Sequence, residues 1–294
     1  MKRYSIGEKA FDSLNYIVLM LLGIVTLYPF LNVAAISLNE SLDTVKGGIT
    51  LWPRVFTLAN YREIFQYDIL VTAVGISILR TVAGTAAGII STGMVAFVIS
   101  REDFIFRKLV TALFVITMYV GGGMIPDYML IKNVGLTNNF LVYILPGLVG
   151  VFNVFVLRSF IDGLPFELQE SAKLDGANDF VIFFRIIFPL CLPAIATLSL
   201  FIAVGQWNSW FDTMLYAGSN KYLTTLQYEL QKILTNSQAS RDMYRGLDPS
   251  KPAPVSPESI QMAMTIVATV PILFVYPFVQ KYFIKGLTLG AVKS

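Results

Sequence analysis

The residues of this sequence best suited to chemistry are a few polar side chains set inside long apolar stretches. They are Arg80, Asn153 and a denser group consisting of Gln206, Trp207, Asn208, Trp210 and Asp212. An arginine in such a place could pair with a carboxylate, and indole faces beside amides suit flat, hydroxyl-bearing rings. Simpler interpretations stay open. Arg80 could bond to the carbonyls of a neighbouring helix, Asn153 could join two helices, and the tryptophans could form an interfacial belt.

The composition argues against an enzyme. The 294 residues include no histidine, the commonest general base and transition-metal ligand. The single cysteine, Cys191, can form neither an internal disulfide nor a metal cluster. A Gly-x4-Gly-Lys-Ser/Thr phosphate loop is absent from the sequence, so we do not expect this chain to bind or hydrolyse ATP itself. We expect no catalytic residue, no metal and no cofactor.

The elements that must position these residues are apolar helices. Hydrophobic residues make up 55% of the chain and charged residues only 14%, against roughly a quarter charged in soluble domains. Segments that could cross a membrane, which takes about 20 apolar residues, lie at roughly 14–38, 71–99, 109–131, 140–161, 186–211 and 261–284. Lipid-exposed backbone must satisfy its own hydrogen bonds. The prediction is therefore an all-α polytopic membrane protein with about six transmembrane helices, the third broken at Gly121-Gly122-Gly123 and Pro126.

The distribution of lysine and arginine predicts the orientation of the chain. Positive charges are densest in the compact loops and tails on one side, which the positive-inside rule places in the cytoplasm. Both termini and the segment 163–185 would then be cytoplasmic, and the long loop 212–260 would lie outside. That loop contains a helical pattern over 223–234 and a stiff proline-rich spacer over 249–257. The first apolar run is too long for a signal peptide, and we interpret it as a retained anchor.

A short polar segment between two apolar ones predicts a docking element. It reads Glu170-Ser171-Ala172-Lys173-Leu174-Asp175-Gly176-Ala177, and Ile186, Phe188 and Pro189 follow it. Pro165 and Glu167 suit the first turn of a helix, and Gly176 tolerates the left-handed conformation that ends one. Asn178 or Asp179 can cap a second helix. The segment is therefore expected to form a helix–turn–helix with its elbow at Gly176, and an interfacial loop without a partner is the alternative.

The spacing of these residues closely resembles the EAA loop of ABC-importer permeases, Glu-Ala-Ala-x3-Gly-x9-Ile-x-Leu-Pro. Here Ser171 replaces the second residue of the motif and Phe188 replaces its Leu. In that family the loop is the coupling helix and sits in a cleft of a cytoplasmic ATPase. The resemblance implies that an ATPase joint is contacted or shaped by Glu170, Ser171, Ala172, Leu174, Asp175, Gly176 and Ala177. It also implies that Ile186 and Pro189 mark re-entry into the membrane.

Two further stretches narrow the resemblance. The residues 285–293, KGLTLGAVK, look like the C-terminal ending of maltose-type carbohydrate permeases, with Ser294 in place of the usual last Gly. The segment 121–136 and the stretch 271–285 resemble permeases for uronate-containing oligosaccharides of the aldouronate or alginate type. The resemblance extends over most of the chain. It implies a single permease domain over 1–294 in the bacterial cytoplasmic (inner) membrane.

The function implied is that of a transmembrane permease subunit of an ATP-driven, binding-protein-dependent oligosaccharide importer that works by alternating access. Its implied partners are a second permease subunit, two ABC ATPase subunits that bind the ATP, an extracytoplasmic sugar-binding protein, the oligosaccharide and membrane lipid. Nucleic acid is not expected. Arg80, Asn153, Gln206, Trp207, Asn208 and Trp210 are the candidates for the substrate path. A permease for a non-sugar solute and an ATP-independent secondary carrier are the alternatives.

Overall fold

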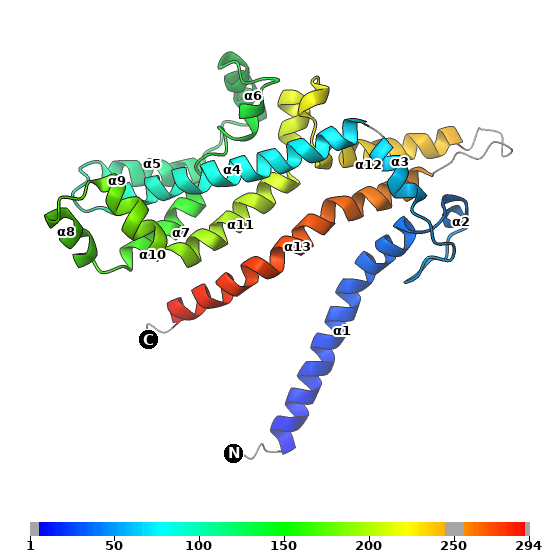
Figure 1. Cartoon of the computed structure of the whole chain (residues 1–294), viewed down its shortest axis with the longest axis horizontal. Helices are drawn as coiled ribbons and strands as arrows, with labels where there is room; N and C mark the ends of the chain where they lie inside the picture. The colour runs from blue at the N-terminus through cyan, green and yellow to red at the C-terminus, as the bar shows by residue number, and fades with distance from the viewer. Residues whose placement is uncertain (1–5, 67, 245–255, 292–294) are drawn as a thin grey trace. The chain divides into compact units, whose positions relative to one another are not determined.

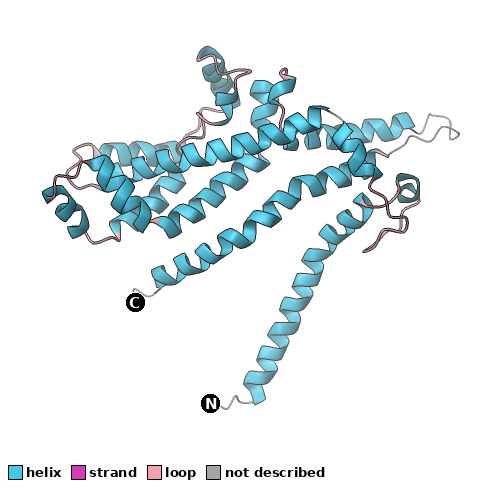
Figure 2. Ribbon diagram, viewed as in Figure 1, coloured by secondary structure: helices cyan, strands magenta, loops and turns pink. Residues whose placement is uncertain are grey.

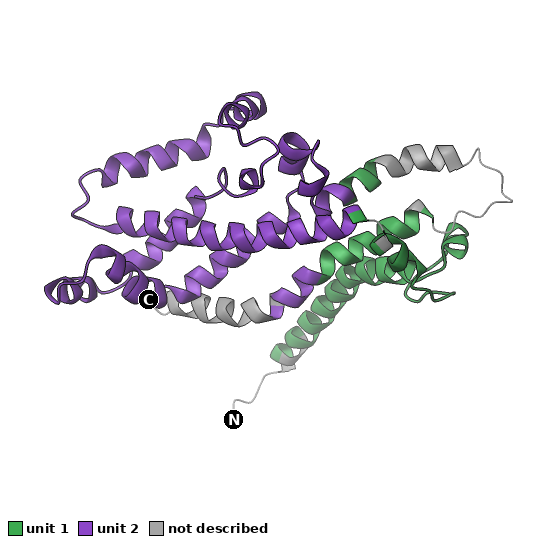
Figure 3. Ribbon diagram, turned by 45° about the horizontal axis from the view of Figure 1, so that its top comes forward, with its two compact units in different colours: residues 1–68, 230–270 green, residues 69–229, 271–294 purple. Residues whose placement is uncertain are grey.

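A computed structural model describes residues 6–66, 68–244 and 256–291. These residues form helices joined by loops, and β-pairing among them is confined to one isolated bridge between Asn39 and Phe56 (Figure 2). The chain divides into two compact units. Unit 1 comprises residues 1–68 and 230–270, and unit 2 comprises residues 69–229 and 271–294 (Figure 3).

Unit 1 begins with α1 (Ile6–Ser37), a 32-residue helix that contains the first predicted apolar segment. Its stretch Phe11–Ser37 contains an 18-residue window with a mean hydropathy of 2.2 and no buried residue. A helix that is apolar around its circumference and uncovered by its own chain is solvated by lipid or by a partner helix. α1 therefore has the properties of a membrane span.

Polar side chains hold the loop that follows α1 in unit 1. The short helices α2 (Ser41–Val45) and α3 (Ala59–Gln66) flank it. Asn39 is fully buried, donates to Asp43 Oδ2 and Thr44 Oγ1 at 3.1 Å each, and accepts from the Val55 amide at 2.9 Å. Because buried polar groups are costly unless bonded, these contacts fix the loop in one conformation.

Unit 2 is built on α4 (Asp68–Ser100), a 33-residue helix rich in small residues. α7 (Val151–Asp162) and α11 (Leu192–Asn208) share a core with it, and α5 (Arg107–Tyr119) lies against α7 (Figure 1). The shorter elements of this unit are α6 (Met124–Asn133), η1 (Phe140–Tyr143), α8 (Glu167–Leu174), α9 (Asp179–Ile182), η2 (Phe183–Ile187), α10 (Phe188–Leu190), η3 (Thr213–Ala217) and η4 (Lys221–Leu223).

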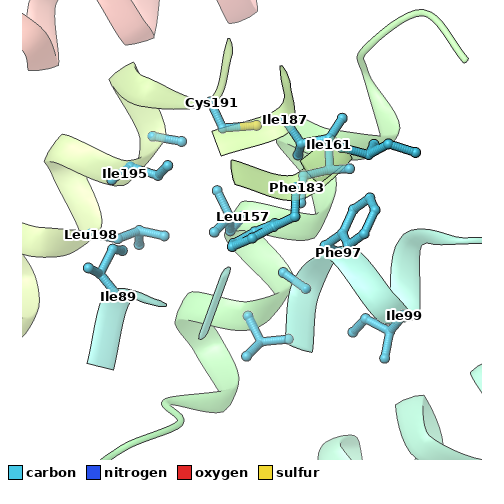
Figure 4. Close-up of a cluster of buried hydrophobic side chains, with 14 of the residues drawn as sticks. Ile89, Phe97, Ile99, Leu157, Ile161, Phe183, Ile187, Cys191, Ile195 and Leu198 are labelled. Carbon is cyan, nitrogen blue, oxygen red and sulfur yellow. The ribbon is translucent and has the colours of Figure 1, made fainter. Parts of the chain in front are cut away.

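The core of unit 2 joins α4, α7 and α11 to the segment containing α8 and α9. Leu157 and Leu198 are almost fully buried, and Phe183 lies between them and Phe97, as Figure 4 shows. Gly93 allows this close packing, since a Cβ there would lie 3.0 Å from Cζ of Phe183. The absence of a side chain at Gly93 thus lets α4 approach the segment that contains Phe183.

Two helices continue from one unit into the other along the sequence. α12 (Leu226–Tyr244) begins three residues later than the helical pattern at 223–234 predicts and runs ten residues further. α13 (Pro257–Ala291) contains the last apolar segment and the residues 285–291 of the C-terminal motif. The proline-rich positions 249–255 and residues 292–294 lie outside the described residues.

Three helical stretches are unbroken and apolar enough to cross a membrane: Phe11–Ser37, Asp68–Ser100 and Glu258–Val275. The pair Asp179–Leu190 and Leu192–Asn208 becomes a fourth if its 86° bend is counted as one broken span. The predicted break in the 109–131 segment is confirmed, because α5 ends at Tyr119 and α6 starts after Gly123, whose φ is +86°.

Two of the predicted segments differ from continuous helices. The segment 140–161 contains only the short η1 and, after a loop with Pro146, Gly147 and Gly150, the 12-residue α7. Prolines and glycines disfavour an unbroken helix there. The segment 186–211 is interrupted at Cys191, between Pro189 and Pro193, where the chain turns by 86°. Of the six predicted membrane segments, those at 109–131, 140–161 and 186–211 are therefore interrupted rather than continuous helices.

Candidate functional site

The polar segment 163–185 forms the predicted helix–turn–helix. α8 ends at Leu174 and α9 begins at Asp179, with Gly176 between them at a φ of +81°. The amides of Gly176 and Ala177 donate to the carbonyls of Lys173 and Ala172 at 3.0 and 2.9 Å. This pair of bonds closes a helix end around a left-handed glycine. The Asn178 side chain caps α9 by accepting from the Val181 amide at 2.9 Å.

The two faces of α8 differ in burial. Gln169 and Ala172, three residues apart, point inward and are 7% and 8% exposed. Phe166, Glu170 and Leu174, each four residues apart, are exposed, and Leu174 is 89% exposed. Residues four apart share one side of a helix. The outer side of the elbow therefore exposes two large apolar side chains and a carboxylate.

The other residues of the motif shape the elbow. Ser171 and Asp175 are exposed, and Ala177 packs against the core together with Ile186. Pro189 lies in α10, directly before the bend at Cys191. Ala172 belongs to the core cluster, where a larger side chain would displace its neighbours. Position 172 therefore holds the elbow against the core of unit 2, whereas positions 170 and 174 face outward.

A buried polar network forms around Arg80 of α4. Its guanidinium is 2% exposed and contacts Asp212 Oδ2 at 2.5 Å and Oδ1 at 3.2 Å. It also donates to Gln206 Oε1 at 3.0 and 3.1 Å and to the Ser209 carbonyl at 3.4 Å. Of the two interpretations of Arg80, this geometry favours bonding to neighbouring elements. Its charge is neutralised by Asp212 within the chain.

Tyr143 completes the network, although it was not among the residues predicted from the sequence. Its ring lies 4.4 Å from the Arg80 guanidinium carbon, and its hydroxyl donates to the Leu223 carbonyl at 2.6 Å. Gln206 Nε2 donates to the Tyr143 carbonyl at 3.0 Å. A Cβ at Gly84 would lie 2.8 Å from the Gln206 amide. Tyr143 is an aromatic residue in an apolar run, where no sequence signal marks it as an arginine partner.

The remaining substrate-path candidates differ in exposure. Trp207 is 7% exposed, whereas Asn208 is exposed and accepts from Gln227 Nε2 at 3.1 Å. Trp210 is half-buried and packs edge-on against Phe211, with ring centroids 5.7 Å apart. Asn153 is half-buried near the start of α7. Among residues 6–66, 68–244 and 256–291, no group of three His, Cys, Asp or Glu side chains could hold a metal ion.

Residues 16–289 match the sequence profile of the family described as "Binding-protein-dependent transport system inner membrane component". The chain belongs to this family. It is a membrane permease component of a transporter, and the elbow described above is built from the residues that resemble the family's EAA loop.

Curated relatives of this permease match along nearly all of its length. The polygalacturonan/rhamnogalacturonan transport system permease protein YtcP of Bacillus subtilis is 39% identical over 98% of this chain and 99% of the relative. The arabinooligosaccharides transport system permease protein AraQ of Halalkalibacterium halodurans is 28% identical, covering 93% of each chain.

A solved structure supports the permease fold. A chain from the crystal structure of a bacterial ABC transporter involved in the import of the acidic polysaccharide alginate superposes with a TM-score of 0.84. The match covers 96% of this permease and 100% of the other chain, at 24% identity. The all-α fold predicted from the apolar segments is confirmed.

Proposed function

We propose that this permease is one of two membrane subunits of an ATP-driven importer of oligosaccharides, with acidic, uronate-containing chains as the preferred class. Its proposed partners are a second permease, two cytoplasmic ABC ATPase subunits and an extracytoplasmic sugar-binding protein. The permease contributes the path through the membrane and no catalytic residue. The ATPase subunits bind and hydrolyse the ATP.

The observation that carries this proposal is the elbow of α8 and α9. One side of α8 is anchored in the core of unit 2 through Ala172, and the opposite side presents Phe166, Glu170 and Leu174. An element held on one side and exposed on the other can transmit the movement of a partner into the protein. The similarity to YtcP, by name a polygalacturonan/rhamnogalacturonan permease, supports the substrate class.

The proposed mechanism is alternating access between two arrangements of the helices. Closure of the ATPase pair on ATP moves the elbows and shifts the helices toward an outward-open arrangement, and hydrolysis returns them. A ligand changes such an equilibrium only by binding the two states with different affinity. The loaded binding protein would favour the outward-open state, and sugar would then enter the path.

We propose different roles for the residues predicted to line the substrate path. Asn208 and Trp210 keep exposed surface, an amide and an indole face, which suits sugar hydroxyls and rings. Asn153 is a weaker candidate. Arg80, Gln206 and Trp207 are buried or engaged, so we assign Arg80 and Gln206 to the support of the path rather than to direct contact.

The proposal is tested by reconstituting the permease with its partner subunits in liposomes and measuring uptake of a solute panel. The panel contains galacturonate oligosaccharides, neutral oligosaccharides, an amino acid and phosphate. We expect ATP-dependent uptake of the galacturonate chains at least tenfold above the other solutes. Preference for phosphate or an amino acid would contradict the substrate class, and uptake by this chain alone without ATP would contradict the whole proposal.

A second measurement tests the docking element. Glu170→Lys reverses a charge on the outer side of α8, and Gly176→Pro removes the amide that donates to Lys173. Both variants should lose co-purification of the ATPase subunits while remaining in the membrane fraction. The matched control is Gly205→Ala, since a Cβ at Gly205 in α11 meets no atom within 4 Å. Undiminished ATPase binding by both variants would contradict the docking role.

A further inference from the structure

Arg101 follows directly after the last residue of α4; it contacts α9 of the elbow directly and α8 only through Asp103. Its Nε and Nη2 donate to the two carboxylate oxygens of Asp103 at 2.8 and 2.5 Å, and its Nη1 donates to Asp179 Oδ1. Asp179 is the first residue of α9. Asp103 in turn accepts from Lys173 Nζ of α8 at 3.3 Å. One chain of ionic contacts, Lys173–Asp103–Arg101–Asp179, therefore links α8 and α9 to the end of α4.

These ion pairs add little to folding stability. Arg101 is 11% exposed, but Asp103 and Asp179 are 61% and 62% exposed. Water screens such pairs, and each contributes only about 0–1 kcal/mol. Their geometry is nevertheless specific, because a guanidinium binds a carboxylate through two parallel bonds and has a further donor for a second one. The arrangement is therefore better suited to fixing the orientation of the Arg101 side chain between the two carboxylates than to stabilising the fold.

The packing around Arg101 leaves the apolar seam between α4 and α9 incomplete. A cavity of about 440 Å³ opens there, lined by Phe97, Val98, Phe180 and Phe183 among others. The Arg101 guanidinium carbon lies 5.7 Å from the Phe97 ring, and the Phe97 and Phe183 rings are 5.7 Å apart. Apolar contact covers only part of this seam. The ionic chain therefore adds a polar link between the elbow and the last turn of α4, beside the apolar contact of Phe97 with Phe183.

We propose that Arg101 is a positioning residue that transmits the movement of the elbow to α4. This inference rests on the proposed function. When a partner displaces α8 and α9, the carboxylate of Asp179 moves and pulls the Arg101 guanidinium with it. Since α4 is one unbroken helix of 33 residues, it moves as a whole. The helix also carries Arg80 and its network, 21 positions before Arg101 in the sequence. Movement at the elbow thereby reaches the buried polar network around Asp212.

The experiment compares the reconstituted wild-type importer with Arg101→Gln and Asp179→Asn. The readout is the ratio of ATPase activity with the substrate-loaded binding protein to activity without it. We expect this ratio to fall at least fivefold in both variants, with assembly intact and the melting temperature within a few degrees of wild type. Arg101→Lys keeps the positive charge but lacks the planar guanidinium and its parallel donors. Its ratio should therefore lie between those of Arg101→Gln and wild type.

The double variant Arg101→Gln/Asp179→Asn separates a shared role from two independent ones. If both residues act through one contact, the double variant is no worse than either single variant. The matched control is Arg158→Gln, which removes an ion pair to Asp162 at 3.4 Å on α7. We expect its stimulation ratio to stay within twofold of wild type.

The outcomes distinguish this inference from the proposed function. A wild-type complex that binds no ATPase subunit, or whose ATPase does not respond to the binding protein, contradicts the proposed function. A responsive wild type with unchanged ratios in Arg101→Gln and Asp179→Asn overturns the role of Arg101. A large loss of melting temperature or assembly in Asp179→Asn, which leaves the Arg101–Asp103 contact in place, assigns this cluster to folding and also overturns it.

Discussion

At the residue scale, the partners of Arg80 and Arg101 are exposed to very different degrees. Arg80 and Asp212 are 2% and 23% exposed, whereas the carboxylates that face Arg101 are mostly in water. Removing one member of a buried pair leaves a charge without compensation, which is strongly destabilising. Removing one member of an exposed pair is not. We therefore expect Arg80 to matter chiefly for stability and Arg101 for coupling.

Replacing Arg80 by Met should lower the melting temperature of the purified complex by roughly 6–10 °C, corresponding to a cost of about 3 kcal/mol. The cause is the Asp212 carboxylate, which loses its counter-charge. The double variant Arg80→Met/Asp212→Asn should recover part of this loss, because no unpaired charge remains. Equal melting temperatures for Arg80→Met and wild type would contradict the assigned role of the pair.

The pH dependence of the Arg101 cluster follows from Asp103. Hydrogen bonding from Arg101, with Lys173 adding to it, holds the pKa of the Asp103 carboxyl well below its usual range. Its contribution is therefore complete above the ordinary aspartate pKa of about 4 and is lost only as the pH falls below that value. The melting-temperature difference between wild type and Asp103→Asn should be small and constant from pH 8 to pH 5. A difference that halves over this range would show that the carboxyl titrates there.

At the element scale, the elbow was predictable from the sequence and the interrupted helices were predictable only in part. Glycine at 176 and the cap at 178 are local signals, and local interactions form the turn. The break after Gly123 also has a local cause. The partners of Arg80 lie 126 and 132 residues away, so no local pattern could pair them. Arg101 was likewise missed, since an arginine after an apolar run usually marks only a membrane boundary.

The packing of α4 against the elbow gives a prediction for this element. Gly93→Val should separate α4 from the Phe183 ring, because even a Cβ at position 93 would lie 3.0 Å from that ring. Overpacking of this kind costs about 1–3 kcal/mol, so the melting temperature should fall by several degrees. Gly75→Val is the control on the same helix, since a Cβ at Gly75 meets nothing within 4 Å. Similar losses in both variants would indicate a general intolerance of α4 to valine.

At the scale of the whole molecule, a coupling role for the elbow requires that the elbow and the loop after α1 lie on opposite sides of the membrane. The permease fold establishes the architecture, and the lysine and arginine distribution predicts the direction in which it is inserted. Leu174 on the elbow is 89% exposed and Trp52 in the loop after α1 is 83% exposed. Cys191 is only 2% exposed, so the native chain provides an almost unreactive background for thiol labelling.

The most direct test of the central claim is therefore the accessibility of Leu174→Cys to a membrane-impermeant thiol reagent. In intact cells we expect Trp52→Cys to be labelled and Leu174→Cys to remain unlabelled. In inside-out vesicles Leu174→Cys should react, and added ATPase subunits should protect it. Labelling of Leu174→Cys from outside intact cells, or no protection by the ATPase subunits, would contradict a cytoplasmic coupling element.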